Sequence, residues 1–156
     1  MRASLPTIIL RHRKENLRKC SLRGLEGRSD LLFFTYPDER PPPLDEYLYL
    51  TSDAPPLTEE DARRGLFLID ATWNRAKTMA GRVALPRVWR SLPRGIVTAY
   101  PRRQTGCDNP ERGLASVEAL YGAYVITGRC VEGLLDHYYP GDTFLARNDF
   151  GSVNRG

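Results

Sequence analysis

The sequence lacks long hydrophobic runs. Its longest apolar stretches, such as residues 66–69, are far shorter than the roughly 20 residues that a membrane-spanning helix needs, so we expect no membrane span. The apolar residues 5–10 are too few for a signal peptide, and no small-residue cleavage site follows them. We therefore expect a cytoplasmic protein.

Cysteine and histidine are scarce. The three cysteines, Cys20, Cys107 and Cys130, form no Cys-x-x-Cys pair, and only two histidines accompany them, so we predict no metal site. The glycine-rich patterns Gly-x-Gly-x-x-Gly and Gly-Lys-Ser/Thr are absent, which excludes ordinary Rossmann dehydrogenases and P-loop enzymes. The Gly-x-Ser-x-Gly turn of the α/β hydrolases is missing as well.

Lysine is also rare, because only three of the 23 basic residues are lysines and the rest are arginines. The net charge of +4 conceals segments of opposite sign: residues 1–28 carry +6, residues 29–61 carry −8, residues 62–112 carry +8 and residues 113–156 carry −2. Arginine binds phosphate through its planar fork and stacks on bases, so the two basic segments favour a nucleic-acid partner. A high-GC genome that writes arginine on a solvated surface explains the same composition equally well.

The remaining composition is that of an ordinary globular protein. The chain has 156 residues, of which 41% are hydrophobic and 27% charged, so we expect one compact domain over residues 1–156. Apolar runs predict strands at residues 5–10, 31–36, 47–50, 66–69 and 96–100. Capping signals and helical spacing predict helices after Thr58 and over residues 72–80, 115–126 and 131–138. This alternation predicts an α/β domain with a mostly parallel sheet and a ligand at the carboxyl ends of its strands.

Two segments are candidates for chemistry. Asp70 ends a buried strand and Trp73 opens the next helix, so the pair is placed to meet a ribose hydroxyl, an amine, an adenine ring or a sulfonium. The alternative makes Asp70 a helix cap and Trp73 a core anchor. The loop over residues 101–113 combines arginine with Gln, Asp and Asn, a mixture that suits phosphates and base edges and equally suits a solvated loop.

Several ordered motifs resemble the aminocarboxypropyltransferases of ribosome biogenesis, and together they extend over most of the chain. These motifs are Arg11-His12-Arg13-Lys14-Glu15-Asn16, Lys19-Cys20-Ser21, Leu68-Ile69-Asp70-Ala71-Thr72-Trp73, Leu114-Ala115-Ser116-Val117-Glu118-Ala119-Leu120, Tyr124-Val125-Ile126-Thr127-Gly128 and Phe144-Leu145-Ala146-Arg147-Asn148. The Asp70–Trp73 segment also resembles the related Asp-Thr-Trp (DTW) domain enzymes that modify tRNA uridine. The paired amino-terminal cysteines of many tRNA enzymes are missing here.

The resemblance implies a SPOUT-like α/β fold with a C-terminal trefoil knot. It also implies S-adenosylmethionine as cofactor, with Ser21 near its methionine end and Ile69 and Asp70 near the ribose or amino-acid part. Trp73 then walls the pocket. By the same resemblance, the adenine is expected against Gly113, Leu114, Ala115 and Ser116.

The implied reaction moves the 3-amino-3-carboxypropyl group to a uridine-type base of rRNA or tRNA and releases methylthioadenosine. Asp70 is the first candidate for a base or orienting group, and Glu118 is the second. The predicted RNA contacts are Arg11, Arg13, Lys14, Arg102 and Arg103. An RNA methyltransferase of the same fold and a non-catalytic RNA-binding protein remain the alternatives, and the oligomeric state is left open.

Overall fold

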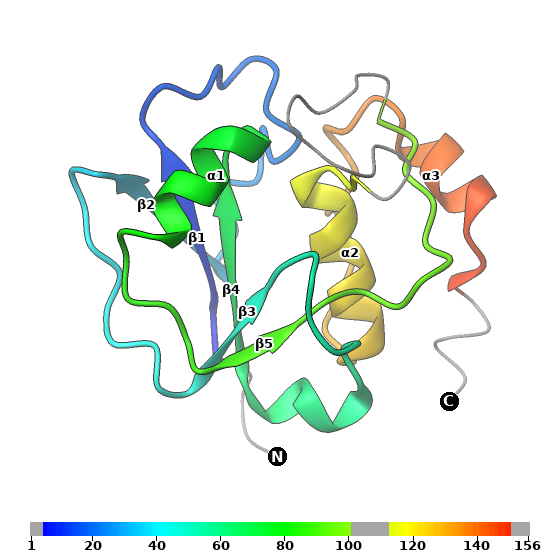
Figure 1. Cartoon of the computed structure of the whole chain (residues 1–156). Coiled ribbons are helices and arrows are strands. Elements are labelled where there is room, and N and C mark those ends of the chain that lie inside the picture. Colours follow the sequence, from blue (N-terminus) through cyan, green and yellow to red (C-terminus); the bar gives the residue numbers. More distant parts are fainter. Residues whose placement is uncertain (1–4, 101–112, 151–156) are drawn as a thin grey trace.

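A five-stranded parallel sheet forms the centre of the molecule. The computed structural model describes residues 5–100 and 113–150 (Figure 1). The strands are β1 (Thr7–His12), β2 (Leu31–Tyr36), β3 (Tyr47–Leu50), β4 (Gly65–Asp70) and β5 (Val88–Arg90). They lie in the order β2-β1-β4-β3-β5, and every neighbouring pair is parallel. All carboxyl ends therefore meet along one edge of the sheet, the upper edge in Figure 1.

Both faces of the sheet are covered by apolar side chains. Successive residues of a strand point to opposite faces, so Ile9 of β1 belongs to one core cluster while its neighbours Ile8 and Leu10 belong to the other. Strand β4 divides in the same way, with Leu68 on the first face and Phe67 on the second. Continuous apolar strands of this kind are typical of a parallel sheet buried on both sides.

Each face is covered by a different helix. Helix α2 (Ser116–Ile126) contributes Val117, Leu120 and Tyr124 to the core cluster that contains Ile9. The Tyr124 hydroxyl also lies 2.8 Å from the hydroxyl of Thr7 on β1, which fixes the helix to the sheet. Helix α1 (Trp73–Ala80) contributes Met79 to the opposite cluster. The two helices therefore flank the sheet, and both begin near its carboxyl edge (Figure 1).

Most of the predicted elements are confirmed. The expected strands over residues 31–36 and 47–50 match β2 and β3, and the helix expected over residues 115–126 is α2, one residue shorter. The helix expected after Thr58 is a 3-10 helix, η1 (Glu59–Arg63). Its start is capped as predicted, because the Thr58 N–H donates to the Asp61 carboxylate at 3.0 Å.

The strand predicted over residues 96–100 is wrong. Its backbone donors bond side chains instead of a neighbouring strand: the Val97 N–H donates to Asn148 at 2.7 Å, and the Ala99 N–H donates to Glu118 at 2.8 Å. The fifth strand is β5, which lies in a segment where no strand was predicted. At three residues, β5 is too short for its alternation to be read from the sequence.

The helix predicted over residues 131–138 is also wrong. This segment forms consecutive turns, with bonds such as Leu134 N–H to the Val131 carbonyl, and Gly133 has a φ of +81° that no right-handed helix allows. The last helix is instead α3 (Gly141–Arg147). Within the described residues, no helix is both long enough and apolar enough to cross a bilayer.

Candidate active site

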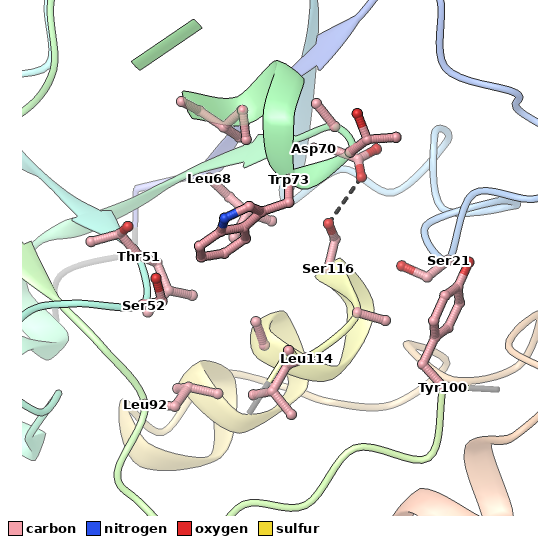
Figure 2. Close-up of a pocket in the computed structure, with 18 of the residues that line it drawn as sticks. Ser21, Thr51, Ser52, Leu68, Asp70, Trp73, Leu92, Tyr100, Leu114 and Ser116 are labelled. Atoms are coloured by element: carbon pink, nitrogen blue, oxygen red, sulfur yellow. Dashed lines mark hydrogen bonds between the residues drawn. The ribbon is translucent and has the colours of Figure 1, made fainter. Parts of the chain in front are cut away.

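A cavity of about 800 Å³ opens at the carboxyl edge of the sheet, between the starts of α1 and α2 (Figure 2). This volume lies within the range of small-molecule sites. Its wall includes all eight residues that we predicted to bind the cofactor: Ser21, Ile69, Asp70, Trp73, Gly113, Leu114, Ala115 and Ser116. Three segments that are far apart in the sequence therefore meet at one cavity, where the strand-end rule predicts a ligand.

Asp70 is held by three side chains at the base of this cavity. The Arg11 Nε–H donates to Asp70 Oδ2 at 3.0 Å, and the Cys20 thiol donates to the same oxygen at 3.1 Å. The Ser116 hydroxyl donates to Asp70 Oδ1 at 2.9 Å, the bond drawn in Figure 2. None of these partners is a backbone N–H of α1, and the residue at the cap position of that helix is Thr72. Asp70 therefore lines the cavity and is not the helix cap of the alternative interpretation.

Arg11 is buried beside Asp70. Its guanidinium also donates to Glu26 at 3.2 Å and lies 4.6 Å from the centre of the Phe33 ring. Only 7% of the residue is exposed, and its charge is paired with the buried Asp70 and with the exposed Glu26. We predicted Arg11 as an RNA contact, and the burial corrects this placement, because a phosphate cannot reach an enclosed guanidinium. No sequence pattern distinguished Arg11 from the exposed Arg13 and Lys14.

The Cys20 thiol remains protonated in this network. Burial, followed by the negative charge of Asp70, raises the pKa of Cys20 from 9.0 to about 12. The proton that the thiol donates to Asp70 is therefore retained throughout the neutral pH range. The hydrogen bond from Cys20 to Asp70 could not be predicted from the sequence, because a single cysteine outside any spacing motif does not indicate a function.

We expect this shift to make Cys20 unreactive in the folded protein. In a Cys107→Ser variant at pH 8, Cys130, which is exposed, should react rapidly with a thiol reagent such as dithiobis-nitrobenzoate. Cys20 should react about a thousandfold more slowly, because three pKa units remove that factor of thiolate. After unfolding in urea, both thiols should react at one rate. Equal rates in the folded state would contradict the network.

The first turn of α2 is capped by a residue from a distant loop. Its N-cap residue is Ala115, whose side chain has no acceptor, and the Val117 N–H instead donates to the Ser21 hydroxyl at 3.1 Å. Ser21 thereby accepts a hydrogen bond from one of the free N–H groups at the helix start. Its own O–H can still donate to another acceptor. The hydroxyl lines the cavity, as does Ser116 from the first position of the helix.

Glu118 lies behind the wall of the cavity and is not part of its lining. The residue is completely buried, and its carboxylate accepts four hydrogen bonds of 2.7 to 2.9 Å. The donors are the Thr98 hydroxyl, the Ala99 N–H, the Ala115 N–H and the Tyr138 hydroxyl. Glu118 therefore joins two other chain segments to the start of α2, a position that suits structural support better than contact with a substrate.

The Glu118 network extends to the cavity through two tyrosines. Burial and the adjacent Glu118 carboxylate raise the pKa of Tyr138, so its hydroxyl stays a donor. The Tyr138 ring stacks on Tyr100 with centroids 6.5 Å apart and planes 7° from parallel, and Tyr100 lines the cavity. Glu118 thus orients a wall residue that the sequence analysis did not single out.

Trp73 contributes a hydrogen-bond donor that has no partner. Its indole projects into the cavity from the start of α1 (Figure 2). Lys77 Nζ lies over this ring, 5.7 Å from its centroid. The Nε1–H is buried, and among the described residues it donates to no acceptor. Buried donors are almost always satisfied, so an unpaired one on a residue that lines a cavity is an exception to the usual pattern. Trp73 is therefore not the simple core anchor of the alternative interpretation.

The rest of the cavity is built by strand ends that we did not predict as site residues. Residues 51–53 follow β3, and residues 91–96 follow β5, and both stretches line the cavity. Residues 91–96 were missed because β5 was not recognised, whereas residues 51–53 follow a strand that was predicted. Arg102 and Arg103 lie outside the described residues. Among the described residues, no group of three His, Cys, Asp or Glu side chains is arranged to hold a metal.

Comparison with known proteins identifies relatives of this fold among solved structures. No family model and no curated protein sequence matches the chain. Among solved structures, the chain is similar to the SAM-dependent rRNA:acp-transferase Tsr3 from Vulcanisaeta distributa, with a TM-score of 0.69 and 23% sequence identity. The match covers 97% of this chain and 82% of that one. This protein therefore has the α/β fold of that transferase.

Proposed function

We propose that this protein is an S-adenosylmethionine-dependent transferase that moves the 3-amino-3-carboxypropyl group to a uridine-type base of RNA, with rRNA as the substrate. One observation carries the proposal: eight residues predicted from the family resemblance, drawn from three distant segments, line a single cavity at the carboxyl edge of the sheet. The fold relative supports it, because its reaction is the one that the resemblance implies.

The cavity suits S-adenosylmethionine in size and in chemistry. The unpaired Trp73 Nε1–H offers a donor to one of the many acceptors of this molecule. The indole face suits a sulfonium, because a cation is attracted to the negative face of an aromatic ring. The Ser21 and Ser116 hydroxyls and the start of α2 add polar groups at the opposite wall. When bound, the molecule supplies a sulfonium leaving group, so no protein nucleophile is required.

The proposed work of the chain is to hold the two reactants and to keep water out. Asp70 already accepts three hydrogen bonds, so we assign it an orienting role for Ser116 and the cavity base rather than that of a free base. Arg11 balances its charge inside the protein. Positioning of this kind supplies several kcal/mol of rate enhancement without a catalytic triad.

The RNA is expected to approach over the exposed basic residues of the cavity rim. Lys14 lines the cavity and is exposed, and Arg13 beside it is exposed too. Arg102 and Arg103 stay predicted RNA contacts. The SPOUT class, the C-terminal trefoil knot and the relation to the tRNA enzymes likewise stay predictions, carried by the family resemblance alone. The cytoplasmic location stays a prediction from the hydrophobic pattern of the sequence.

The nucleoside by-product tests this proposal. Purified protein is incubated with S-adenosylmethionine and with total RNA from cells that lack the modification, and the small molecules are separated by mass. We expect methylthioadenosine in an amount that rises with the RNA supplied. S-adenosylhomocysteine in its place would establish a methyltransferase. No turnover, together with no calorimetric binding of S-adenosylmethionine, would contradict the transferase proposal and favour the alternative of a non-catalytic RNA-binding protein.

A further inference from the structure

A second hollow lies on the other side of α1 from the large cavity. Its volume is about 240 Å³, and it is lined by the ends of β1 and β2 and by one face of the helix. The lining residues are His12, Tyr36, Asn74, Arg75, Thr78, Met79 and Arg82. Arg75 also lines the large cavity, so the two sites share a wall.

The helix face in this hollow is polar and basic. The buried Met79 also lines the hollow. Asn74 and Thr78 are four residues apart on α1 and therefore share one face of the helix, and Arg82 lies just beyond the end of the helix at Ala80. All three are exposed. Arg75 is paired with Glu15 at 2.6 Å, whereas Arg82 has no ion-pair partner within residues 5–100 and 113–150. Arg82 is therefore available to an anion.

The strand ends contribute two aromatic rings. The His12 and Tyr36 centroids are 5.6 Å apart, and both rings are half-buried. The His12 Nδ1 accepts the Lys14 N–H at 3.1 Å, which leaves Nε2 as the protonated donor of the neutral ring. Burial, followed by the charge of Arg75, lowers the pKa of His12 from 6.5, so the ring is neutral at pH 7. A neutral ring pair suits stacking on a base better than binding of an anion.

We propose that this hollow binds one nucleotide of the RNA strand next to the base that reacts in the large cavity. Arg82 holds the phosphate, the His12 and Tyr36 rings stack on the base, and the Asn74 amide meets its polar edge. Aromatic rings and amides contact bases, whereas arginine binds phosphate, so these four residues together fit a nucleotide better than a free anion. The inference rests on the proposed function, because it assumes an RNA strand that reaches from the large cavity to this hollow.

The test uses the full chain and a fluorescent single-stranded oligouridylate, with anisotropy read at several salt concentrations. We expect Arg82→Ala to weaken binding about tenfold and to reduce the slope of log affinity against log salt by about one, because one phosphate contact is lost. Asn74→Ala should weaken binding by a similar factor without changing the slope, because it removes a neutral contact. The matched control is Arg63→Ala, an exposed arginine of η1 away from both cavities, which should bind as the parent does.

The outcomes separate the two proposals. If the parent binds the oligouridylate and both Arg82→Ala and Asn74→Ala bind it as tightly as Arg63→Ala does, the nucleotide site is overturned while the proposed function stands. If the parent binds neither the oligouridylate nor S-adenosylmethionine, the proposed function falls and this inference falls with it. Calorimetry should give S-adenosylmethionine the same affinity for Arg82→Ala as for the parent, which shows that the variant is folded.

Discussion

Replacing Glu118 with alanine is expected to lower the free energy of unfolding by about 4 kcal/mol or more. The carboxylate is completely buried, and its removal leaves four donors without a partner, two of which are backbone N–H groups. Each buried donor left unsatisfied costs about 1–3 kcal/mol. Urea unfolding followed by circular dichroism measures the loss as a lower midpoint at an unchanged slope.

Glu132→Ala is the matched control, because Glu132 is an exposed glutamate. Its effect should stay within about 0.5 kcal/mol, as is usual for surface substitutions. A Glu118 variant as stable as this control would contradict the structural role. A Glu118→Gln variant with parental stability but much slower transfer would restore the catalytic role that the sequence first suggested.

Replacing Asp70 with asparagine should have the largest effect on turnover. The amide keeps the size of the side chain but not its charge, so Arg11 loses a buried partner and Ser116 loses an ionised acceptor. We expect the rate of group transfer to fall by about a hundredfold or more, since small misplacements of reacting groups cost that much. Stability should also fall, by about 3 kcal/mol, because a buried ion pair loses one charge.

Single-turnover kinetics with S-adenosylmethionine at saturation separates the rate effect from weakened binding. Asp45→Asn, which changes an exposed aspartate, controls for the loss of one negative charge. If the Asp70 variant turned over at the parental rate with normal affinity for S-adenosylmethionine, Asp70 would have neither the orienting role nor that of a base.

The sequence predicted the cavity better than it predicted the elements that frame it. Residues 66–69 are continuously apolar, so the central strand and the position of Asp70 at its end follow from burial alone. The prediction of a strand over residues 96–100 was wrong because apolar alternation cannot reveal that the backbone N–H groups of this segment donate to the side chains of Glu118 and Asn148. Hydrogen-bond partners that lie 19 and 51 residues away are invisible to a local pattern.

Arg11 shows the same limit at the site itself. It stands in a basic run, and composition treats every arginine of that run as exposed. Only the sheet order, which puts β1 beside β4 and Arg11 opposite Asp70 in register, reveals that this arginine is an internal counter-ion. The unpaired Trp73 N–H likewise becomes visible only when the surroundings of the ring are known.

The most direct test of the proposed reaction follows two fragments of S-adenosylmethionine separately. RNA from cells lacking the modification is incubated with the protein and with S-adenosylmethionine labelled either on the carboxyl carbon or on the methyl group. The account predicts carboxyl label in the RNA, in a band of ribosomal size, while all methyl label leaves in methylthioadenosine. Methyl label in the RNA, without carboxyl label, would contradict it.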